Sequence, residues 1–174
     1  MPDATALARA ESLITSIPDY PKPGIVFRDI TPLLTDAAAV RTVVDALIEP
    51  FVGRFDAVAG VEARGFLLAG AAAIAANVGL MPIRKAGKLP RPAASMSYDL
   101  EYGSAQIEMH DDNAAGARVL LLDDVLATGG TLRAGRDLLQ AVGSEVVGIA
   151  TLLEIDGLGG REALGGDLHS VFHV

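Results

Sequence analysis

The chain has 174 residues, of which 51% are hydrophobic and only 5% aromatic, and this composition predicts a single domain, 1–174, with an aliphatic core. A formal net charge of −8 argues against nucleic acid and acidic membrane surfaces as partners. There is no cysteine, which excludes disulfides, thiolate zinc sites and cysteine nucleophiles. The three histidines are scattered, so we expect no metal site built from protein ligands. Without a secretory signal or a membrane-spanning segment, we expect a cytoplasmic protein.

The N-terminal part combines a predicted helix with a proline-rich segment. Apolar residues recur at helical spacing over Ala4–Ile17, and Pro18 is expected to end this helix. Prolines and a glycine then exclude a long regular element between residues 17 and 31. This segment contains the apolar stretch Gly24–Ile30, which we expect to be a loop. Phe27 in this stretch either seats the loop on the core or stacks on a flat heterocycle, and the residues alone leave both interpretations open.

A second helix and a first strand–turn–helix corner follow. An apolar stripe predicts a helix over Asp36–Val52, with Asp36 as N-cap and Pro50 ending or kinking it. Ala57–Val61 is typical of a short buried strand, and a helix rich in small residues begins after Glu62–Phe66. Arg64 in this corner suits an anion such as pyrophosphate.

The middle of the chain is expected to form a basic loop and a hairpin. After a predicted strand at Leu80–Ile83, the loop Arg84–Pro92 contains four cations. They are either a solvated surface or a mobile cover that brings cations to a polyphosphate. Loose alternation over Ser95–Met109 predicts a hairpin that turns near Glu101–Gly103.

The most informative stretch is Val119–Leu132. Four apolar residues predict a buried strand that ends at Asp123 and Asp124. The small residues Ala127–Thr131 then lead into a helix, so their backbone N–H groups form a cradle for a phosphate. The two carboxylates would accept hydrogen bonds from sugar hydroxyls, which predicts a site for a phosphorylated ribose.

The alternation of strands and helices predicts an α/β fold. With a further strand at Glu145–Leu153 and an edge strand at His169–Val174, we expect a doubly wound, mostly parallel sheet with helices on both faces. The two anion-binding corners would lie at the carboxyl ends of their strands, on one rim of the sheet.

These motifs resemble those of a known family. Residues 123–131 are similar to the phosphoribosyl-pyrophosphate (PRPP) signature of type I phosphoribosyltransferases. Tyr20–Ile30 resembles the purine loop of the adenine phosphoribosyltransferases, and Glu62–Phe66 resembles their pyrophosphate loop. Arg84–Pro90 and Ser97–Gly103 resemble their flexible hood, a loop and hairpin. The order of the four blocks is that of the family.

The resemblance implies a reaction and its partners. The implied reaction is that of adenine with PRPP, giving AMP and pyrophosphate in purine salvage, with Mg²⁺ as cofactor. Mg²⁺ would be held mainly by pyrophosphate, ribose oxygens and water, because the sequence offers no protein cage. The family also leads us to expect a homodimer.

The resemblance further implies a role for each site residue, group by group. The 5′-phosphate would be held by Ala127, Thr128, Gly129, Gly130 and Thr131, and the ribose hydroxyls by Asp123 and Asp124. Pyrophosphate would be bound by Arg64, beside a strained peptide at Ala63–Arg64, together with Arg84, Lys85 and Lys88, some of them from a neighbouring subunit. Adenine would be read by main-chain groups of Val26 and Arg28 and held between Phe27 and Leu126. Glu101 is the implied catalytic acid or base.

Two other interpretations stay open at this point. One is a transferase for a 6-oxopurine (guanine, hypoxanthine or xanthine), although such a pocket usually offers a cationic donor to the exocyclic oxygen. The other is a regulator that senses PRPP without catalysis. The hood, Glu101 and Arg64 argue against that regulator.

Overall fold

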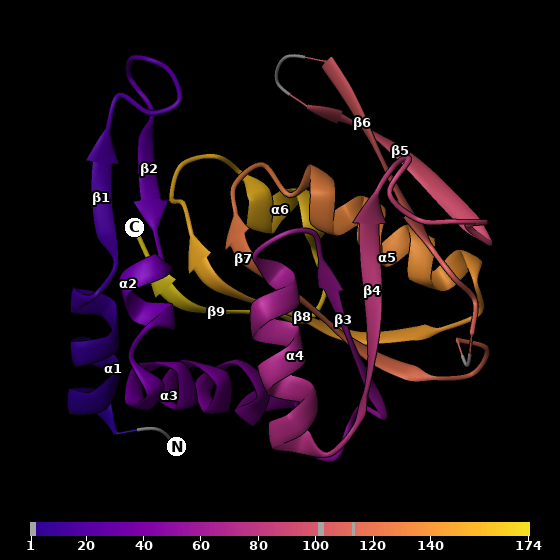
Figure 1. Cartoon of the computed structure of the whole chain (residues 1–174), viewed down its shortest axis with the longest axis horizontal. Helices are drawn as coiled ribbons and strands as arrows, with labels where there is room; N and C mark the ends of the chain where they lie inside the picture. The colour runs from indigo at the N-terminus through magenta and orange to yellow at the C-terminus, as the bar shows by residue number, and fades with distance from the viewer. Residues whose placement is uncertain (1–2, 101–102, 113) are drawn as a thin grey trace. The chain divides into compact units, whose positions relative to one another are not determined.

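The computed structural model describes residues 3–100, 103–112 and 114–174. The chain divides into two compact units, Met1–Ala46 and Leu47–Val174, and Figure 1 labels their elements. Among the described residues, no helix has both the length and the apolar character that crossing a bilayer demands.

The first unit contains a short hairpin that the sequence did not predict. Its elements are α1 (Ala4–Ser12), β1 (Thr15–Pro18), β2 (Val26–Asp29), α2 (Thr31–Leu34) and the greater part of α3 (Ala37–Ile48). The helix predicted to reach Ile17 ends at Ser12, because residues 15–18 pair antiparallel with residues 26–29 and place Ile17 opposite Phe27. The prediction of a loop at Gly24–Ile30 is therefore wrong for Val26–Asp29, which form β2.

The predicted helix over Asp36–Val52 is confirmed, although the regular α-helix is shorter and runs from Ala37 to Ile48. Asp36 Oδ1 accepts a hydrogen bond of 2.9 Å from the Ala39 N–H, as an N-cap does. Arg9 forms an ion pair with Asp36 and lowers the pKa of this carboxyl to about 2. Pro50 lies in the 3-10 turn η1 (Glu49–Phe51) directly after α3, as its missing N–H requires.

The second unit is built on a seven-stranded sheet. The strands are β3 (Ala57–Val61), β4 (Gly79–Lys85), β5 (Ala94–Leu100), β6 (Gly103–Met109), β7 (Arg118–Leu126), β8 (Glu145–Glu154) and β9 (Leu168–His173). Their order is β5-β6-β4-β3-β7-β8-β9. The five strands from β4 to β9 in this order are parallel, whereas β6 pairs antiparallel with both β4 and β5. The mostly parallel sheet, the hairpin and the edge strand are confirmed.

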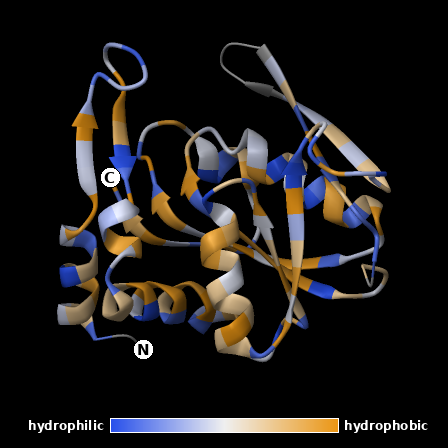
Figure 2. Cartoon of the chain, in the orientation of Figure 1, coloured by the Kyte–Doolittle hydropathy of each residue, from blue (hydrophilic) through white to orange (hydrophobic). Residues whose placement is uncertain are grey.

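Helices cover both faces of this sheet. The chain leaves β3 through α4 (Gly65–Ala76) toward β4, and it leaves β7 through α5 (Gly130–Ala141) in the opposite direction toward β8. Right-handed crossovers in opposite directions put the two helices on opposite faces. Apolar side chains on one face of β3 and β7 form a core with Leu132, Leu138 and Leu139 of α5, and the apolar colouring of these central strands is visible in Figure 2.

Two boundaries differ from the prediction in a way that matters for the site. β7 continues through Asp123 and Asp124 to Leu126, because β8 pairs with it that far. Arg84 and Lys85 belong to the carboxyl end of β4 and not to a loop, and this end is hydrophilic in Figure 2. A short helix that the sequence did not predict, α6 (Gly160–Leu164), follows β8.

Candidate functional site

The predicted anion-binding corners meet at one rim of the second unit. β3 and β7 are neighbours in the sheet, and the chain leaves them in opposite directions. In an open α/β sheet such a switch point leaves a crevice at the carboxyl ends of the strands. A Cβ on Gly65 would lie 2.8 Å from Asp123 Oδ1, so the turn after β3 touches the acidic pair of β7. Within that turn the cis peptide joins Glu62 and Ala63, one bond before the strained peptide that the resemblance implied.

The acidic pair is buried and bound to the predicted arginine. Asp123 and Asp124 are 8% and 5% exposed. Asp123 Oδ1 accepts a hydrogen bond of 2.8 Å from the Asp124 N–H. Arg64 Nη2 lies 2.6 Å from Asp124 Oδ2. The structure thus brings Arg64, Asp123 and Asp124 together, as the corners predicted.

Burial also changes the acidity of this pair. Loss of water raises the pKa of Asp123 well above its ordinary value, and the neighbouring charge of Asp124 raises it further. Burial likewise raises the pKa of Asp124, although the Arg64 guanidinium opposes this shift. Two carboxylates this close titrate as a pair, and hydroxyl donors of a sugar would restore the hydrogen bonds that water no longer supplies.

The predicted phosphate cradle contains a cavity of about 190 Å³ at the start of α5. It is lined by Asp123 and by residues 125–132. Gly129 has a φ of +82° as the N-cap of α5, a conformation that suits glycine. The turn therefore leads its backbone N–H groups into the positive end of the helix dipole. The predicted phosphate residues line one cavity.

A residue that the sequence interpretation missed packs against the loop that lines this cavity. A Cβ on Gly160, the first residue of α6, would lie 2.1 Å from the Ala127 carbonyl oxygen. A Cβ on Gly129 would lie 2.9 Å from the Gly160 carbonyl oxygen. Only glycine permits this approach of α6 to the loop. The three glycines within residues 157–160 are visible in the sequence. The sequence does not show that one of them packs against the loop at Ala127.

The predicted cations gather around a second missed residue, Glu62. Its Oε1 accepts a hydrogen bond of 2.9 Å from Lys88 Nζ. Its Oε2 accepts from Arg84 Nε at 3.2 Å and from the Lys85 backbone N–H at 2.9 Å. These bonds, that of Lys88 first, lower the pKa of Glu62 to about 2. The sequence feature that could have indicated Glu62 as a site residue is its position directly after the buried strand β3.

The adenine-binding residues of the prediction lie in different parts of the chain. Val26, Phe27 and Arg28 belong to β2 of the first unit. Phe27 contacts Tyr20 edge-on, with ring centroids 5.3 Å apart. Leu126 is fully buried in the second unit and also lines the phosphate cavity. Glu101 lies outside the described residues, so its role stays a prediction.

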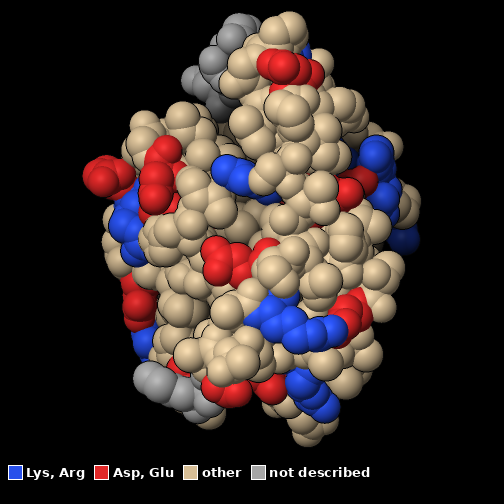
Figure 3. All heavy atoms as spheres, turned by 90° about the vertical axis from the view of Figure 1, so that its left-hand side faces the viewer, with Lys and Arg blue, Asp and Glu red and all other residues tan. Residues whose placement is uncertain are grey.

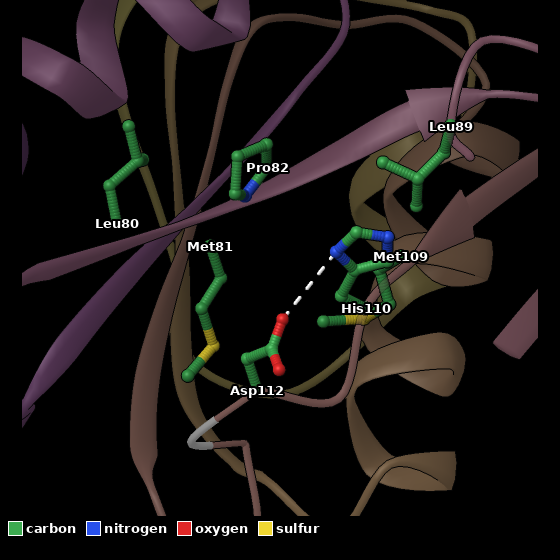
Figure 4. A pocket seen from close by; sticks show the side chains of 7 residues that line it. All are labelled: Leu80, Met81, Pro82, Leu89, Met109, His110 and Asp112. Atoms are coloured by element: carbon green, nitrogen blue, oxygen red, sulfur yellow. Dashed lines mark ion pairs between the residues drawn. The ribbon is translucent and has the colours of Figure 1, made fainter. Parts of the chain in front are cut away.

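A second cavity, of about 250 Å³, contains none of the predicted site residues. Figure 4 shows its lining, which comes from β4, the end of β6 and the segments after them: Leu80, Met81, Pro82, Leu89, Met109, His110 and Asp112. Its polar element is the contact of His110 Nδ1 with Asp112 Oδ2 at 3.5 Å. This lining has no backbone cradle for a phosphate.

Possible metal ligands gather elsewhere. Within the described ranges, the group of three potential ligand residues is Glu154, Asp156 and His173, and none of them lines the phosphate cavity. Glu154 is already bound by Arg161 and Ser170.

Known proteins match both the sequence and the fold. The family model for the phosphoribosyl transferase domain matches residues 33–167. The adenine phosphoribosyltransferase of Renibacterium salmoninarum is 60% identical over 157 residues, which are 90% of this chain and 86% of that protein. The crystal structure of the adenine phosphoribosyltransferase from Rhodothermus marinus has a TM-score of 0.92 at 45% identity, covering 99% of this chain and 100% of that one. The structure of the Giardia lamblia enzyme with 9-deazaadenine has a TM-score of 0.90 at 38% identity, with 97% of both chains covered. The chain therefore belongs to the phosphoribosyltransferase family and, within it, to the adenine phosphoribosyltransferases.

Proposed function

We propose that the protein transfers the phosphoribosyl group of PRPP to adenine, giving AMP and pyrophosphate. The carrying observation is the buried aspartate pair beside the glycine cradle at the carboxyl end of β7. Phosphate groups and sugar hydroxyls need these two kinds of partner side by side. Family membership is independent support.

Different residues at the rim bind different parts of PRPP. The 5′-phosphate binds to the backbone N–H groups and hydroxyls of residues 127–131, and Asp123 and Asp124 accept hydrogen bonds from the ribose hydroxyls. Arg64, whose Nη2 lies 2.6 Å from Asp124 Oδ2, binds the departing pyrophosphate. Arg84, Lys85 and Lys88 add positive charge on the same side. Stabilising the leaving group in this way lowers the barrier to breaking the bond at the anomeric carbon.

Adenine recognition is assigned to the first unit and the hood. Main-chain groups of Val26 and Arg28 read the edge of the base, while Phe27 and Leu126 hold its faces. Glu101 exchanges a proton with the purine nitrogens. The 9-deazaadenine bound in the Giardia lamblia structure supports a purine in this role.

Mg²⁺ is the proposed cofactor, and when bound it neutralises charge on the diphosphate. The donor set at the rim fits a cation held through PRPP oxygens and water. Asp124 is engaged by Arg64, and this contact leaves the aspartate pair poorly suited to a direct cage.

We also propose a homodimer. Leu67 and Ile74, two helical turns apart on α4, are 55% and 85% exposed. An apolar face of this kind on a helix that is apolar all round is typical of a surface that another chain covers.

The remaining assignments concern domain organisation, location and excluded partners. We propose that the two units act as one phosphoribosyltransferase domain, because the matched region 33–167 runs through their boundary.

A cytoplasmic location is proposed because it suits polyanionic substrates, which a hydrocarbon layer excludes. We propose neither nucleic acid nor membrane as a partner. On the face drawn in Figure 3, basic and acidic side chains are interspersed and not gathered into one basic field.

The decisive experiment measures AMP formation from adenine and PRPP, with and without Mg²⁺. We expect AMP and pyrophosphate in equal amounts, with Mg²⁺ required. Faster turnover of guanine or hypoxanthine at equal PRPP would reject adenine as the substrate. PRPP binding without product from any purine would identify a regulator instead.

A further inference from the structure

Glu62 is a mostly buried carboxylate that gathers the cations of the site. Its side chain is 9% exposed, whereas those of Arg84 and Lys88 are 34% and 54% exposed. It accepts hydrogen bonds from both cations and from the backbone between them. An acid beside a site for polyanions repels the ligand, so its presence there requires an explanation.

The register of the sheet explains how Glu62 reaches these partners. β3 and β4 pair in parallel with Val61 opposite Ile83, and the Glu62 N–H continues this ladder with a hydrogen bond of 2.9 Å to the Ile83 carbonyl. The next residue of β4 is Arg84. Glu62 is thus held one residue past the end of β3, beside Arg84 at the carboxyl end of β4.

The cluster remains cationic after these bonds are made. Glu62 contacts Arg84 and Lys88, and the charge of Lys85 is next in the chain. Glu108 lies opposite Arg84 in β6 and accepts a hydrogen bond from the Gly87 N–H, so three cations stand against two carboxylates. In this pair Arg84 donates through Nε, and a guanidinium has two further NH₂ groups. Lys88 donates once, and an ammonium has three protons. Glu62 can therefore hold both side chains while each keeps the capacity to bind an anion.

We propose that Glu62 is a positioning residue that orders Lys88 and Arg84 at the rim for the diphosphate of PRPP. Without its charge the two cations repel each other and sample many rotamers, and binding the ligand must then order them. The inference rests on the proposed function for the identity of the ligand.

The test compares Glu62→Gln with a matched control, Glu108→Gln. Both variants remove one negative charge near the same segment, and glutamine keeps an acceptor for the backbone N–H in each. Glu108 accepts a hydrogen bond of 3.1 Å from the Gly87 N–H, so it contacts this segment through its backbone. Calorimetry with inorganic pyrophosphate gives the Kd, and initial rates give KM for PRPP, KM for adenine and kcat.

We expect E62Q to raise the Kd for pyrophosphate and the KM for PRPP about tenfold, which corresponds to the rotamer freedom of one released long side chain. The KM for adenine should stay unchanged, a separation that a general loss of folding would not give. E108Q should leave all four quantities near their wild-type values. Unchanged or tighter binding of pyrophosphate by E62Q would overturn the proposal, and tighter binding would identify Glu62 as a competing anion.

A second comparison tests whether Glu62 acts through Lys88. In a Lys88→Met background, the effect of E62Q on pyrophosphate binding should shrink, because one of the two cations that it orders is absent. A full tenfold effect in that background would overturn the proposal. If the wild-type protein binds pyrophosphate but forms no AMP, the proposed reaction fails while these comparisons still decide the role of Glu62.

Discussion

α6 contacts residues 127–131, the proposed phosphate loop, through Gly160. The substitution Gly160→Ala should therefore disturb the position of this loop. The added Cβ would lie 2.1 Å from the Ala127 carbonyl oxygen and 2.8 Å from Leu126 Cδ1. An ordinary contact between carbon and oxygen needs roughly 3.2 Å or more, so α6 or the loop must move by about 1 Å. Gly160 is the first residue of α6 and does not have a positive φ, so the effect is steric and not conformational.

This displacement has two measurable consequences. A shift of about 1 Å in groups that hold a substrate costs about 10²-fold in rate, so kcat/KM for PRPP should fall by roughly that factor. Overpacking of this kind also costs about 1–3 kcal/mol of folding free energy. Initial rates of AMP formation at varied PRPP test the first effect, and thermal melting tests the second.

The control is Gly79→Ala at the amino end of β4. A Cβ there meets nothing within 4 Å and Gly79 is exposed, so this variant should retain both activity and stability. If G160A showed wild-type kcat/KM and melting temperature, the idea that α6 fixes the phosphate loop would be refuted. A loss of stability with unchanged kcat/KM would refute only the link to the cradle.

Four further predictions concern individual side chains. Asp123→Asn with Asp124→Asn should weaken PRPP binding roughly 10²- to 10⁴-fold, since charge-assisted hydrogen bonds contribute about 1.5–3 kcal/mol each; unchanged affinity by calorimetry would remove the ribose assignment. Phe27→Ala should raise the KM for adenine roughly tenfold if it stacks on the base, and an unaltered KM would leave it a core residue. Glu101→Gln should lower kcat by about 10²-fold or more with little change in substrate binding, whereas a wild-type kcat would exclude it as acid or base. The pKa of Glu62 is lowered from 4.5 to about 2, so the unfolded chain takes up its proton first, and stability should fall as pH drops from about 4.5 toward 2. Glu62→Gln should lack this part of the decline in melting temperature, and identical slopes in both proteins would contradict the ion pairs at Glu62.

Much of the site followed from local pattern. The apolar run at Val119–Leu122 predicted a buried strand, and the small residues after it predicted a turn into a helix, because both depend on neighbours within a few positions. The aspartates fell inside β7 and not after it, since pairing with β8, from Asp123 opposite Thr151 to Leu126 opposite Glu154, decides where the strand ends. Similarly, the N-terminal helix stops at Ser12 because the next strand pairs with residues 26–29.

The sequence by itself determined the order of strands and helices, the two anion-binding corners and the family resemblance, because periodicity and short motifs are properties of adjacent residues. Only the tertiary structure decided that Glu62 holds Arg84 and Lys88, that Arg64 pairs with Asp124, and that Gly160 backs the phosphate loop. Each of these contacts joins segments that are distant in the chain and depends on strand register or on the approach of two backbones. A register fixes such distances to within a fraction of an ångström, and no local pattern carries that information.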